Sequence, residues 1–228
     1  MSKLYIVGTP IGNLKDITLR AIDTLRECDI IACEDTRKAK ILLSHFNINK
    51  KLISYHKDNE ERSAQAILKY LVEGNNIALI SEAGTPNLSD PGYDIIQLAY
   101  KNDIEVVPIP GVSALTAAVS VANLPVDRFF FLGFLPMKQG KRKKILEKYK
   151  DIDAALVLYE SPYKLLKTLN LIKEIYGNKQ LFIARELTKI YEEKLTLTSD
   201  EAIKYFSEKK VRGEFVIIVN LKNFQGEL

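Results

Sequence analysis

The sequence predicts an α/β protein of two α/β domains, with a mostly parallel sheet in residues 1–115 and a mixed sheet in residues 116–228. In the first half, short apolar segments alternate five times with segments of helical periodicity, which is typical of a parallel sheet covered by helices on both faces. In the second half, strand-like segments at 180–188 and 190–198 have little between them, which favours antiparallel pairing. No Ser- or Gly-rich linker separates the halves, so we expect a tight interface with a binding cleft between them.

The strands of the first half are predicted from apolar, β-branched runs, and the helices from apolar residues spaced three and four apart. Asp16 is the expected N-cap of the first helix, and Asp90 is expected to cap a later helix with Pro91 at its first position. The predicted strands cover 3–7, 29–33, 51–56, 75–80 and 103–111, and the predicted helices cover 16–28, 34–46, 59–73, 93–101 and 112–122.

The second half begins after Leu124–Asp127, which interrupts the regular alternation. Ser161 is the expected N-cap of one helix there, and the residues around Ser199 form a capping sequence for another. The predicted strands are 128–136, 154–160, 180–188, 190–198 and 213–221, and the predicted helices are 138–150, 161–177 and 199–210.

Polar and conformationally special residues gather where the strands of the first half end. The most elaborate of these segments is SEAGTPNLSDPG at 81–92, directly after a buried strand. One interpretation is an ordinary strand-to-helix turn rich in turn-forming residues. However, Gly8–Pro10, Glu34–Asp35, His56 and Pro110–Gly111 follow the other strands, and the opposite ends carry ordinary turns. Because small molecules bind at the carboxyl ends of strands in open α/β sheets, this asymmetry favours a binding cleft.

Composition excludes several classes of protein. The chain has only two histidines and two cysteines, Cys28 and Cys33, so we expect neither a metal site nor a disulfide scaffold. It has no apolar run long enough to span a bilayer and no typical signal peptide, which favours a cytoplasmic protein without membrane association. The net charge of +4 is mild, but residues 138–150 contain seven basic residues and one acidic residue. Such a segment is either a solvated helix face or a surface for nucleic acid.

The common nucleotide-binding motifs do not fit. The first loop has Gly8 and Gly12 around Pro10, which differs from the spacing of a dinucleotide-binding loop, and no phosphate-binding loop with a G-K-[ST] ending occurs. Glu34 could hold a ribose in a nicotinamide enzyme, but the glycine pattern that should accompany it is missing. No G-x-S-x-G nucleophile motif is present either.

Motifs along nearly the whole chain resemble those of the tetrapyrrole-methylase-fold (class III) methyltransferases. Within that superfamily they are similar to the RsmI, or YraL, branch, which 2′-O-methylates a cytidine of small-subunit (16S) ribosomal RNA. The motifs are GTPIGNLKDITLRA at 8–21, ACEDTR at 32–37, SEAGTPNLSDPG at 81–92, PGVSA at 110–114, FLGFLP at 131–136, YESPYKL at 159–165, ARELTKIYEE at 184–193 and RGEFVIIV at 212–219.

The resemblance implies S-adenosylmethionine as methyl donor, a cofactor cleft between the two domains, a homodimer, and ribosomal RNA or the small ribosomal subunit as partner. A donor without phosphate groups agrees with proline-containing loops in place of a glycine-rich phosphate cradle. The residues implied at the donor site are Pro10, Glu82, Ala83, Gly84, Thr85, Pro86, Ser113, Ala114, Phe134, Leu135, Glu160, Ala184, Arg185, Gly213 and Glu214. Phe134 and Leu135 have an equally good interpretation as core residues.

The reaction implied is attack by a ribose hydroxyl on a sulfonium methyl, which requires in-line positioning and removal of a proton. The sequence does not single out the group that performs this removal. Candidates for catalytic or orienting roles are Glu34, Asp35, His56, Glu186 and Lys189, with His56 better interpreted as a loop residue. Residues expected to contact RNA, including clamps on phosphate or ribose, are Arg37, Lys141, Arg142, Lys143, Lys144, Arg185 and Lys189.

Two features depart from the family pattern. Glu82 stands where the family usually has Asp, which lengthens a side chain near the donor. Relatives often have a further helical segment after the last strand, whereas this sequence stops at Leu228, so we expect RNA to be held differently if that segment binds it. Two other functions stay open: a methyltransferase of the same fold acting on a tetrapyrrole or another small molecule, and a non-catalytic RNA-binding module.

Overall fold

The computed structural model describes residues 2–221. The chain divides into two compact units, Met1–Ser113 and Ala114–Leu228. Each unit contains one five-stranded sheet. The sheet of the first unit is entirely parallel and the sheet of the second is mixed, which confirms the predicted fold class for both halves.

The first sheet has the strand order β3-β2-β4-β1-β5, with β1 and β4 near its centre. Its registers place Ile6 beside Leu79 and Cys33 beside Ile80, so neighbouring strands end at nearly the same level. β2 and β4 are buried along their whole lengths, which explains their uninterrupted apolar sequences. The strands are β1 (Lys3–Val7), β2 (Ile30–Cys33), β3 (Lys51–Ser54), β4 (Ile77–Ile80) and β5 (Glu105–Ile109).

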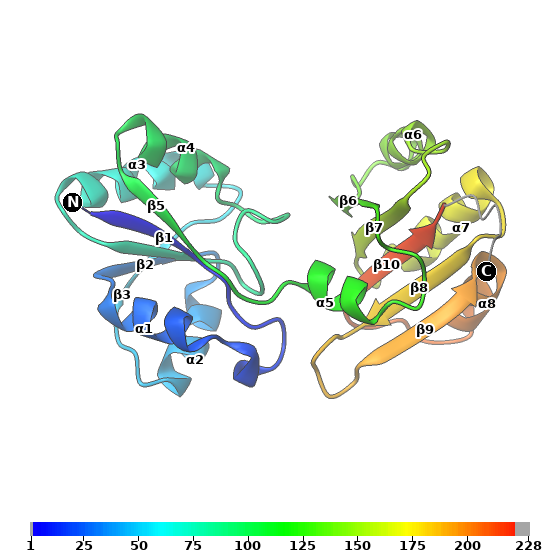
Figure 1. Ribbon diagram of the computed structural model, residues 1–228, viewed down its shortest axis with the longest axis horizontal. Coiled ribbons are helices and arrows are strands. Elements are labelled where there is room, and N and C mark those ends of the chain that lie inside the picture. Colours follow the sequence, from blue (N-terminus) through cyan, green and yellow to red (C-terminus); the bar gives the residue numbers. More distant parts are fainter. Residues whose placement is uncertain (1, 222–228) are drawn as a thin grey trace. The chain divides into compact units, whose positions relative to one another are not determined.

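Helices cover both faces of the first sheet. Figure 1 shows α3 and α4 on one face and α1 and α2 on the other. Each pair builds its own core: Ile67 and Ile95 pack in one cluster, and Leu25 and Leu43 in the other. Cys28 belongs to the second cluster as a buried free thiol, as does Cys33, which confirms that both cysteines serve packing. The helices are η1 (Leu14–Asp16), α1 (Leu19–Glu27), α2 (Thr36–His45), α3 (Glu60–Val72) and α4 (Tyr93–Lys101).

The second sheet has the order β6-β7-β10-β8-β9. β6 and β7 are parallel, and the three pairings that follow are antiparallel, including the predicted pair β8 and β9. β6 lies at an edge and contains a register shift between Phe131 and Gly133. The strands are β6 (Phe129–Phe134), β7 (Ala155–Glu160), β8 (Gln180–Arg185), β9 (Glu193–Thr198) and β10 (Phe215–Asn220).

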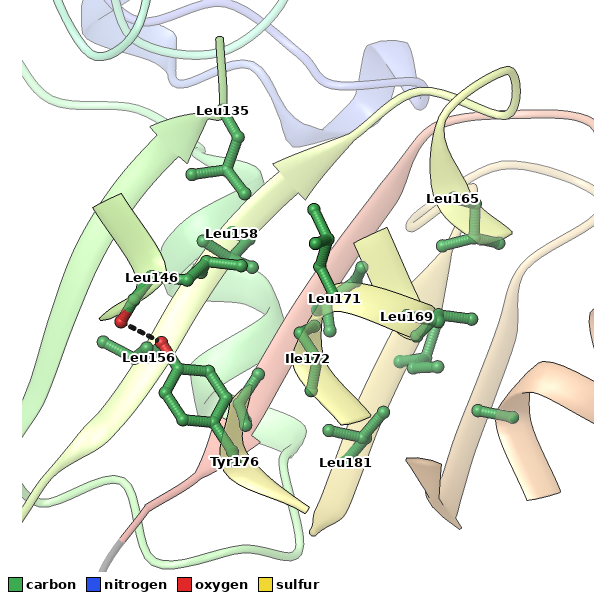
Figure 2. Packing of buried hydrophobic residues seen from close by; sticks show 14 of the residues in the cluster. Leu135, Leu146, Leu156, Leu158, Leu165, Leu169, Leu171, Ile172, Tyr176 and Leu181 are labelled. Atoms are coloured by element: carbon green, nitrogen blue, oxygen red, sulfur yellow. Dashed lines mark hydrogen bonds between the residues drawn. The ribbon is translucent and has the colours of Figure 1, made fainter. Parts of the chain in front are cut away.

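The core of the second unit lies between this sheet and three helices, α6 (Gln139–Lys148), α7 (Leu165–Tyr176) and α8 (Ser199–Ser207). Figure 2 shows leucines of these elements packed together, with the Tyr176 hydroxyl donating to the Leu146 carbonyl at 2.6 Å. α5 (Ala114–Val121) contacts β10. In residues 2–221, no helix combines the length and apolar character that a membrane crossing requires.

Three predicted helix caps are wrong. Asp16 lies in η1, and Thr18 caps α1 instead by accepting from the Ala21 N–H at 3.1 Å. α4 starts at Tyr93 rather than at Pro91, and its first turn is capped from another helix, since the Glu60 carboxylate accepts from the Gly92 N–H at 2.9 Å. α7 starts only at Leu165, because residues 161–164 form a turn in which Ser161 offers its carbonyl rather than its side chain. By contrast, the capping box predicted around Ser199 is present between Thr198 and Glu201.

The loops after β1 and β5 approach each other at two glycines. A Cβ on Gly8 would lie 2.7 Å from the Gly111 Cα, and a Cβ on Gly111 would lie 2.9 Å from the Gly8 carbonyl carbon. The Gly8 N–H also donates to the Ile109 carbonyl at 3.0 Å. No side chain fits between these two backbones, so both positions require glycine.

We therefore expect Gly8→Ala to lower the free energy of unfolding by roughly 1–3 kcal/mol, because the backbone must move to admit the methyl group. Gly140→Ala is the matched control, since a Cβ there has open space and lies in helix α6. That control should leave stability unchanged or raise it by up to about 1 kcal/mol. Urea unfolding measures both, and equal effects of the two substitutions would contradict the close approach.

Candidate active site

The carboxyl edge of the first sheet brings together the residues that follow its strands. Because all five strands are parallel, their ends meet at one edge. Within two residues of each strand's end, in the order of the sheet, lie His56 after β3, Glu34 after β2, Glu82 after β4, Thr9 after β1 and Pro110 after β5. The predicted gathering of polar and special residues at one edge is therefore confirmed.

The loop that follows β4 is tied to the loop that follows β1. The Thr9 N–H donates to the Gly84 carbonyl at 2.8 Å, and the Gly84 N–H donates back to the Thr9 carbonyl at 3.0 Å. The Ser81 hydroxyl donates to the Ala83 and Gly84 carbonyls at 3.3 and 3.4 Å, and Thr85 donates to the Val112 carbonyl at 3.2 Å. These bonds fix the backbone of the loop where a small molecule would meet it.

Gly84 determines the backbone conformation of this loop. It has φ of +83°, and an added Cβ would lie 3.3 Å from the Ile11 side chain. The segment thus needs glycine for its conformation and presents backbone amides and carbonyls rather than bulky side chains. Among the predicted donor-site residues of the first unit, Glu82 and Ala83 are exposed, Thr85 is half-buried, and Pro10, Pro86 and Ser113 are buried.

Glu34 and Glu82 form an acidic pair at this edge. Glu34 is half-buried, and both the carboxylate and the backbone N–H of Glu82 lie close enough to act on its pKa. Burial raises the pKa of Glu34, and the Glu82 carboxylate adds to the rise, while Lys38 and His56 act in the opposite direction. Lys38, from α2, also forms an ion pair with Glu82. The edge therefore has one carboxylate in an environment that favours its neutral form.

Asp35, next to Glu34 in the sequence, caps helix α2. Its carboxylate caps α2 by accepting from the Arg37 N–H at 2.8 Å, and it also accepts from the Arg37 guanidinium at 2.8 and 3.1 Å. The hydrogen bonds from Arg37 hold the pKa of Asp35 well below its usual range. The Arg37 side chain is 88% exposed, so it remains accessible to a partner.

A second polar cluster lies in the second unit, where residues between β8 and β9 meet the start of β10. The Lys189 ammonium donates to the Glu186 and Glu214 carboxylates at 2.9 and 2.8 Å. The Glu214 N–H donates to the Glu186 carboxylate, and the Glu186 N–H donates to the Glu214 carbonyl, both at 3.0 Å. Although burial acts in the opposite direction, the hydrogen bonds from Lys189 and the Glu214 N–H lower the pKa of Glu186.

Backbone strain surrounds this cluster. Glu186 and Thr188 have φ of 50° and 66°, which non-glycine residues adopt uncommonly. Gly213 has φ of +93°, and an added Cβ would lie 2.5 Å from the Glu186 Cγ. Of the other predicted residues here, Ala184 is buried in β8, and Arg185 pairs with Glu193 at 3.2 Å while donating to the Arg212 carbonyl at 2.8 Å. The structure thus places Arg185, Glu186, Lys189, Gly213 and Glu214 together, as the motifs suggested.

The prediction that Arg142 faces RNA is wrong. Its side chain is 3% exposed and forms an ion pair with Glu160, whose side chain is 2% exposed. The Glu160 carboxylate also accepts from the Thr168 hydroxyl and from the Ser161 N–H at 2.8 Å. Burying a guanidinium group costs less free energy when the group pairs with a buried carboxylate. Glu160, predicted at the donor site, therefore has its carboxylate committed to joining α6, β7 and α7.

The remaining predicted residues divide between surface and core. Phe134 is 54% exposed and contacts Tyr159 edge-on, whereas Leu135 belongs to the core of the second unit. Ala114 begins α5, and the next N–H, of Leu115, donates to the Tyr159 hydroxyl at 2.9 Å. On α6, Lys141 and Lys144 are exposed, while Lys143 is half-buried and pairs with Glu174.

Sequence reasoning missed four residues that organise these sites. Lys38 reaches Glu82 across 44 positions, and Thr168 reaches Glu160 from the next helix. The buried Tyr55 hydroxyl donates to Glu60 at 2.9 Å and accepts from the Ile95 N–H at 3.3 Å. No spacing of residues in the sequence predicts these contacts. The tyrosine at the end of an apolar strand indicates only weakly that its hydroxyl has a buried partner. In residues 2–221, no group of three His, Cys, Asp or Glu side chains is arranged to hold a metal ion.

A family model described as Tetrapyrrole (Corrin/Porphyrin) Methylases matches residues 3–203, and the chain belongs to this family. Its similarity to individual members is more specific. It is 46% identical to the Ribosomal RNA small subunit methyltransferase I of Thermotoga maritima, over 97% of this chain and 100% of that protein. It is 49% identical to the proteins of that name from Mycoplasmopsis pulmonis and Halalkalibacterium halodurans, over 97% and 95% of this chain and 99% and 75% of theirs.

Solved structures share the fold at low identity. A diphthine synthase is 17% identical with a TM-score of 0.76, over 96% of this chain and 90% of that one. A uroporphyrin-III C-methyltransferase of Thermus thermophilus, solved with S-adenyl homocysteine, is 16% identical with a TM-score of 0.67, over 96% and 98% of the two chains.

The buried ion pair generates a stability prediction. Arg142→Met and Glu160→Gln should each lower the free energy of unfolding by roughly 3–5 kcal/mol, because each leaves a buried polar partner uncompensated. The double variant should lose much less than the sum of the two.

The matched control is Lys143 with Glu174, a pair that joins α6 to α7 at the surface, with side chains 43% and 53% exposed. There the coupling in a double-mutant cycle should stay below about 1 kcal/mol. Urea unfolding of all six variants measures both cycles, and additive losses for Arg142 and Glu160 would contradict the buried pair.

Proposed function

We propose that this chain transfers a methyl group from S-adenosylmethionine to ribosomal RNA of the small (16S) subunit. The observation that carries the proposal is 42–49% identity, over at least 95% of this chain, to relatives named Ribosomal RNA small subunit methyltransferase I. The finer parts of the proposal are the ribose 2′-hydroxyl of a cytidine as acceptor, an assembled or nascent small subunit as partner, and a cytoplasmic homodimer. These parts rest on the resemblance of the motifs alone.

The carboxyl edge of the first unit fits a donor of this kind. S-Adenosylmethionine supplies an activated methyl group on a positively charged sulfur. The loop at 81–86 offers fixed backbone amides and carbonyls around Gly84, and its acidic neighbours suit a cationic ligand better than a phosphate. We place the donor against this loop of the first unit.

The second unit supplies a surface for the RNA. Lys141, Lys144 and Lys148 lie three and four residues apart on α6, so they share one face of the helix. All three are exposed, whereas Arg142 and Leu146 point into the core. Among the described residues, no carboxylate forms an ion pair with any of the three lysines. This lysine stripe can therefore neutralise phosphates without first breaking an internal bond.

A methyltransferase acting on a tetrapyrrole is the second candidate, favoured by the description of the family and by the fold of its solved members. Those structures are 15–17% identical to this chain, far below the ribosomal RNA methyltransferases. The lysine stripe also suits a polyanion better than an enclosed pigment. A non-catalytic RNA-binding module would need no donor site. Because we assign a donor site to the loop at 81–86, we favour an enzyme over such a module.

The function is tested with small ribosomal subunits from a strain that lacks this methylation. Calorimetry should detect binding of S-adenosylmethionine to the protein alone. With tritium in the methyl group, label should then enter 16S RNA, and alkaline hydrolysis should leave it in an alkali-resistant dinucleotide, because a 2′-O-methyl group blocks cleavage. Donor binding without label in any nucleotide would contradict the proposal, and label in a base would contradict only the ribose assignment.

The lysine stripe is tested by Lys141→Ala, Lys144→Ala and Lys148→Ala in one variant. We expect weaker binding to a 16S RNA transcript, with the slope of log affinity against log salt reduced by about 2–3, since three phosphate contacts are lost. The control variant replaces Lys69, Lys101 and Lys204, three exposed lysines on other helices, and removes the same charge. Equal losses in both variants would show that total charge, rather than this surface, binds RNA.

A further inference from the structure

We propose that Glu34 is the catalytic residue that accepts the proton of the attacking ribose hydroxyl. In this step the hydroxyl oxygen forms a bond to the methyl carbon while the bond from that carbon to sulfur breaks. The sulfur takes the bonding electron pair and becomes a neutral thioether, and the hydroxyl proton moves to a Glu34 carboxylate oxygen. The inference rests on the proposed function and assigns the one role that the motifs left open.

The position of Glu34 is the first argument. It directly follows β2, which pairs with β4, and the register of Cys33 with Ile80 brings Glu34 level with Ser81, the residue before Glu82. Both the carboxylate and the backbone N–H of Glu82 act on the Glu34 carboxylate, so Glu34 lies beside the loop proposed to hold the donor. A proton acceptor must lie within hydrogen-bond reach of the hydroxyl that attacks, and this edge is where donor and acceptor would meet.

The charges around Glu34 are the second argument. Glu82, Lys38 and His56 are the titratable groups that act on it from β4, α2 and β3, and the Asp35–Arg37 pair occupies the first turn of α2. Burial raises the pKa of Glu34, and the charge of Glu82 adds to this, so the carboxylate is a stronger base than an ordinary glutamate. Lys38 pairs with Glu82, which makes Lys38 a positioning residue in this scheme.

Three of the other candidates, Asp35, Glu186 and Lys189, already form hydrogen bonds or ion pairs. Asp35 caps α2, and its pKa is held low by hydrogen bonds from Arg37, which makes it a weak base. The Glu186 carboxylate already accepts from Lys189 and from the Glu214 N–H, and its pKa is lowered. Burial lowers the pKa of Lys189, but hydrogen bonds to Glu214 and Glu186 outweigh this effect and raise it. Lys189 is therefore a cation and has no lone pair to accept a proton. Of the three carboxylates compared, Glu34, Asp35 and Glu186, Glu34 is thus the one whose surroundings favour proton uptake.

The test uses Glu34→Gln, which keeps the shape and removes the basic oxygen, in single-turnover methyl transfer to undermethylated small subunits. We expect a fall in rate of at least about 100-fold near pH 8, with the dissociation constant of S-adenosylmethionine changed less than about twofold. In the wild type the rate should rise with pH through the pKa of Glu34, since only the carboxylate accepts a proton. In Glu34→Gln this rise should disappear.

Glu82→Gln provides a second readout. Removing the neighbouring negative charge should lower the pKa of Glu34, so the rise in rate should move to lower pH. Glu73→Gln, at the opposite end of β4, is the matched control and should leave the pH profile unchanged. A purely structural role of Glu34 would predict none of these shifts.

Stability against pH gives a readout that is independent of activity. Because the pKa of Glu34 is raised in the folded state, its carboxylate form weakens folding, and this effect grows as pH rises through that pKa. Glu34→Gln should therefore be as stable as the wild type below the ordinary pKa of a glutamate, about 4.3, and at least as stable at pH 8.

Two results would overturn the inference while leaving the function intact: wild-type rates in Glu34→Gln, or an unchanged pH profile in that variant. A variant that is less stable at pH 8 would also overturn it, because a structural loss would then explain the fall in rate. A wild type that binds donor and labels no RNA would instead remove the proposed function and this inference with it.

Discussion

The reciprocal hydrogen bonds between Thr9 and Gly84 are the contact on which the candidate site depends. They join the loops that leave β1 and β4, two adjacent strands near the centre of the first sheet. Thr9 and Gly84 are buried, so unpaired backbone groups there would be costly. The same bridge explains why the segment at 81–86 can end a strand without becoming a flexible turn. Gly84 and Pro86 prevent the strand from continuing, and the bridge supplies backbone hydrogen bonds beyond the end of the strand.

The second unit is organised around a different contact, the buried pair of Arg142 and Glu160. One carboxylate receives hydrogen bonds from α6, from α7 and from the turn after β7. This arrangement also fixes the rotation of α6 about its axis, because Arg142 must point inward. Lys141, Lys144 and Lys148 must then point outward. A buried cation thus determines which cations of the same helix remain available to an anionic partner.

Much of the fold could be predicted from the sequence, because the signals that define it are local. The alternation of apolar runs and amphipathic helices gave the parallel sheet, and the short connection between β8 and β9 gave the antiparallel pair. The caps at Asp16, Asp90 and Ser161 failed because a capping residue is chosen by the path of the chain as well as by its type. α4 shows the limit most clearly, since its first turn is satisfied by Glu60 from another helix.

The candidate site divides in the same way. Motif positions such as Gly84 and Gly213 could be predicted, because each needs a backbone conformation or a space that glycine alone supplies. The burial of Arg142 could not, since a run of basic residues gives no sign of which one finds a buried carboxylate. The ion pair of Lys38 could not be predicted either, because its partner Glu82 lies 44 residues away in the sequence.

The two units differ in charge in a manner that suits two different ligands. The carboxyl edge of the first sheet carries two neighbouring carboxylates, Glu34 and Glu82, which disfavour a phosphate group there. The outer face of α6 carries three lysines, so it favours a polyanion. A methyl donor with a sulfonium group is a cation, and RNA is a polyanion. A net charge of +4 is a poor guide to binding in this chain, because it averages an acidic region of the first unit and a basic helix face of the second.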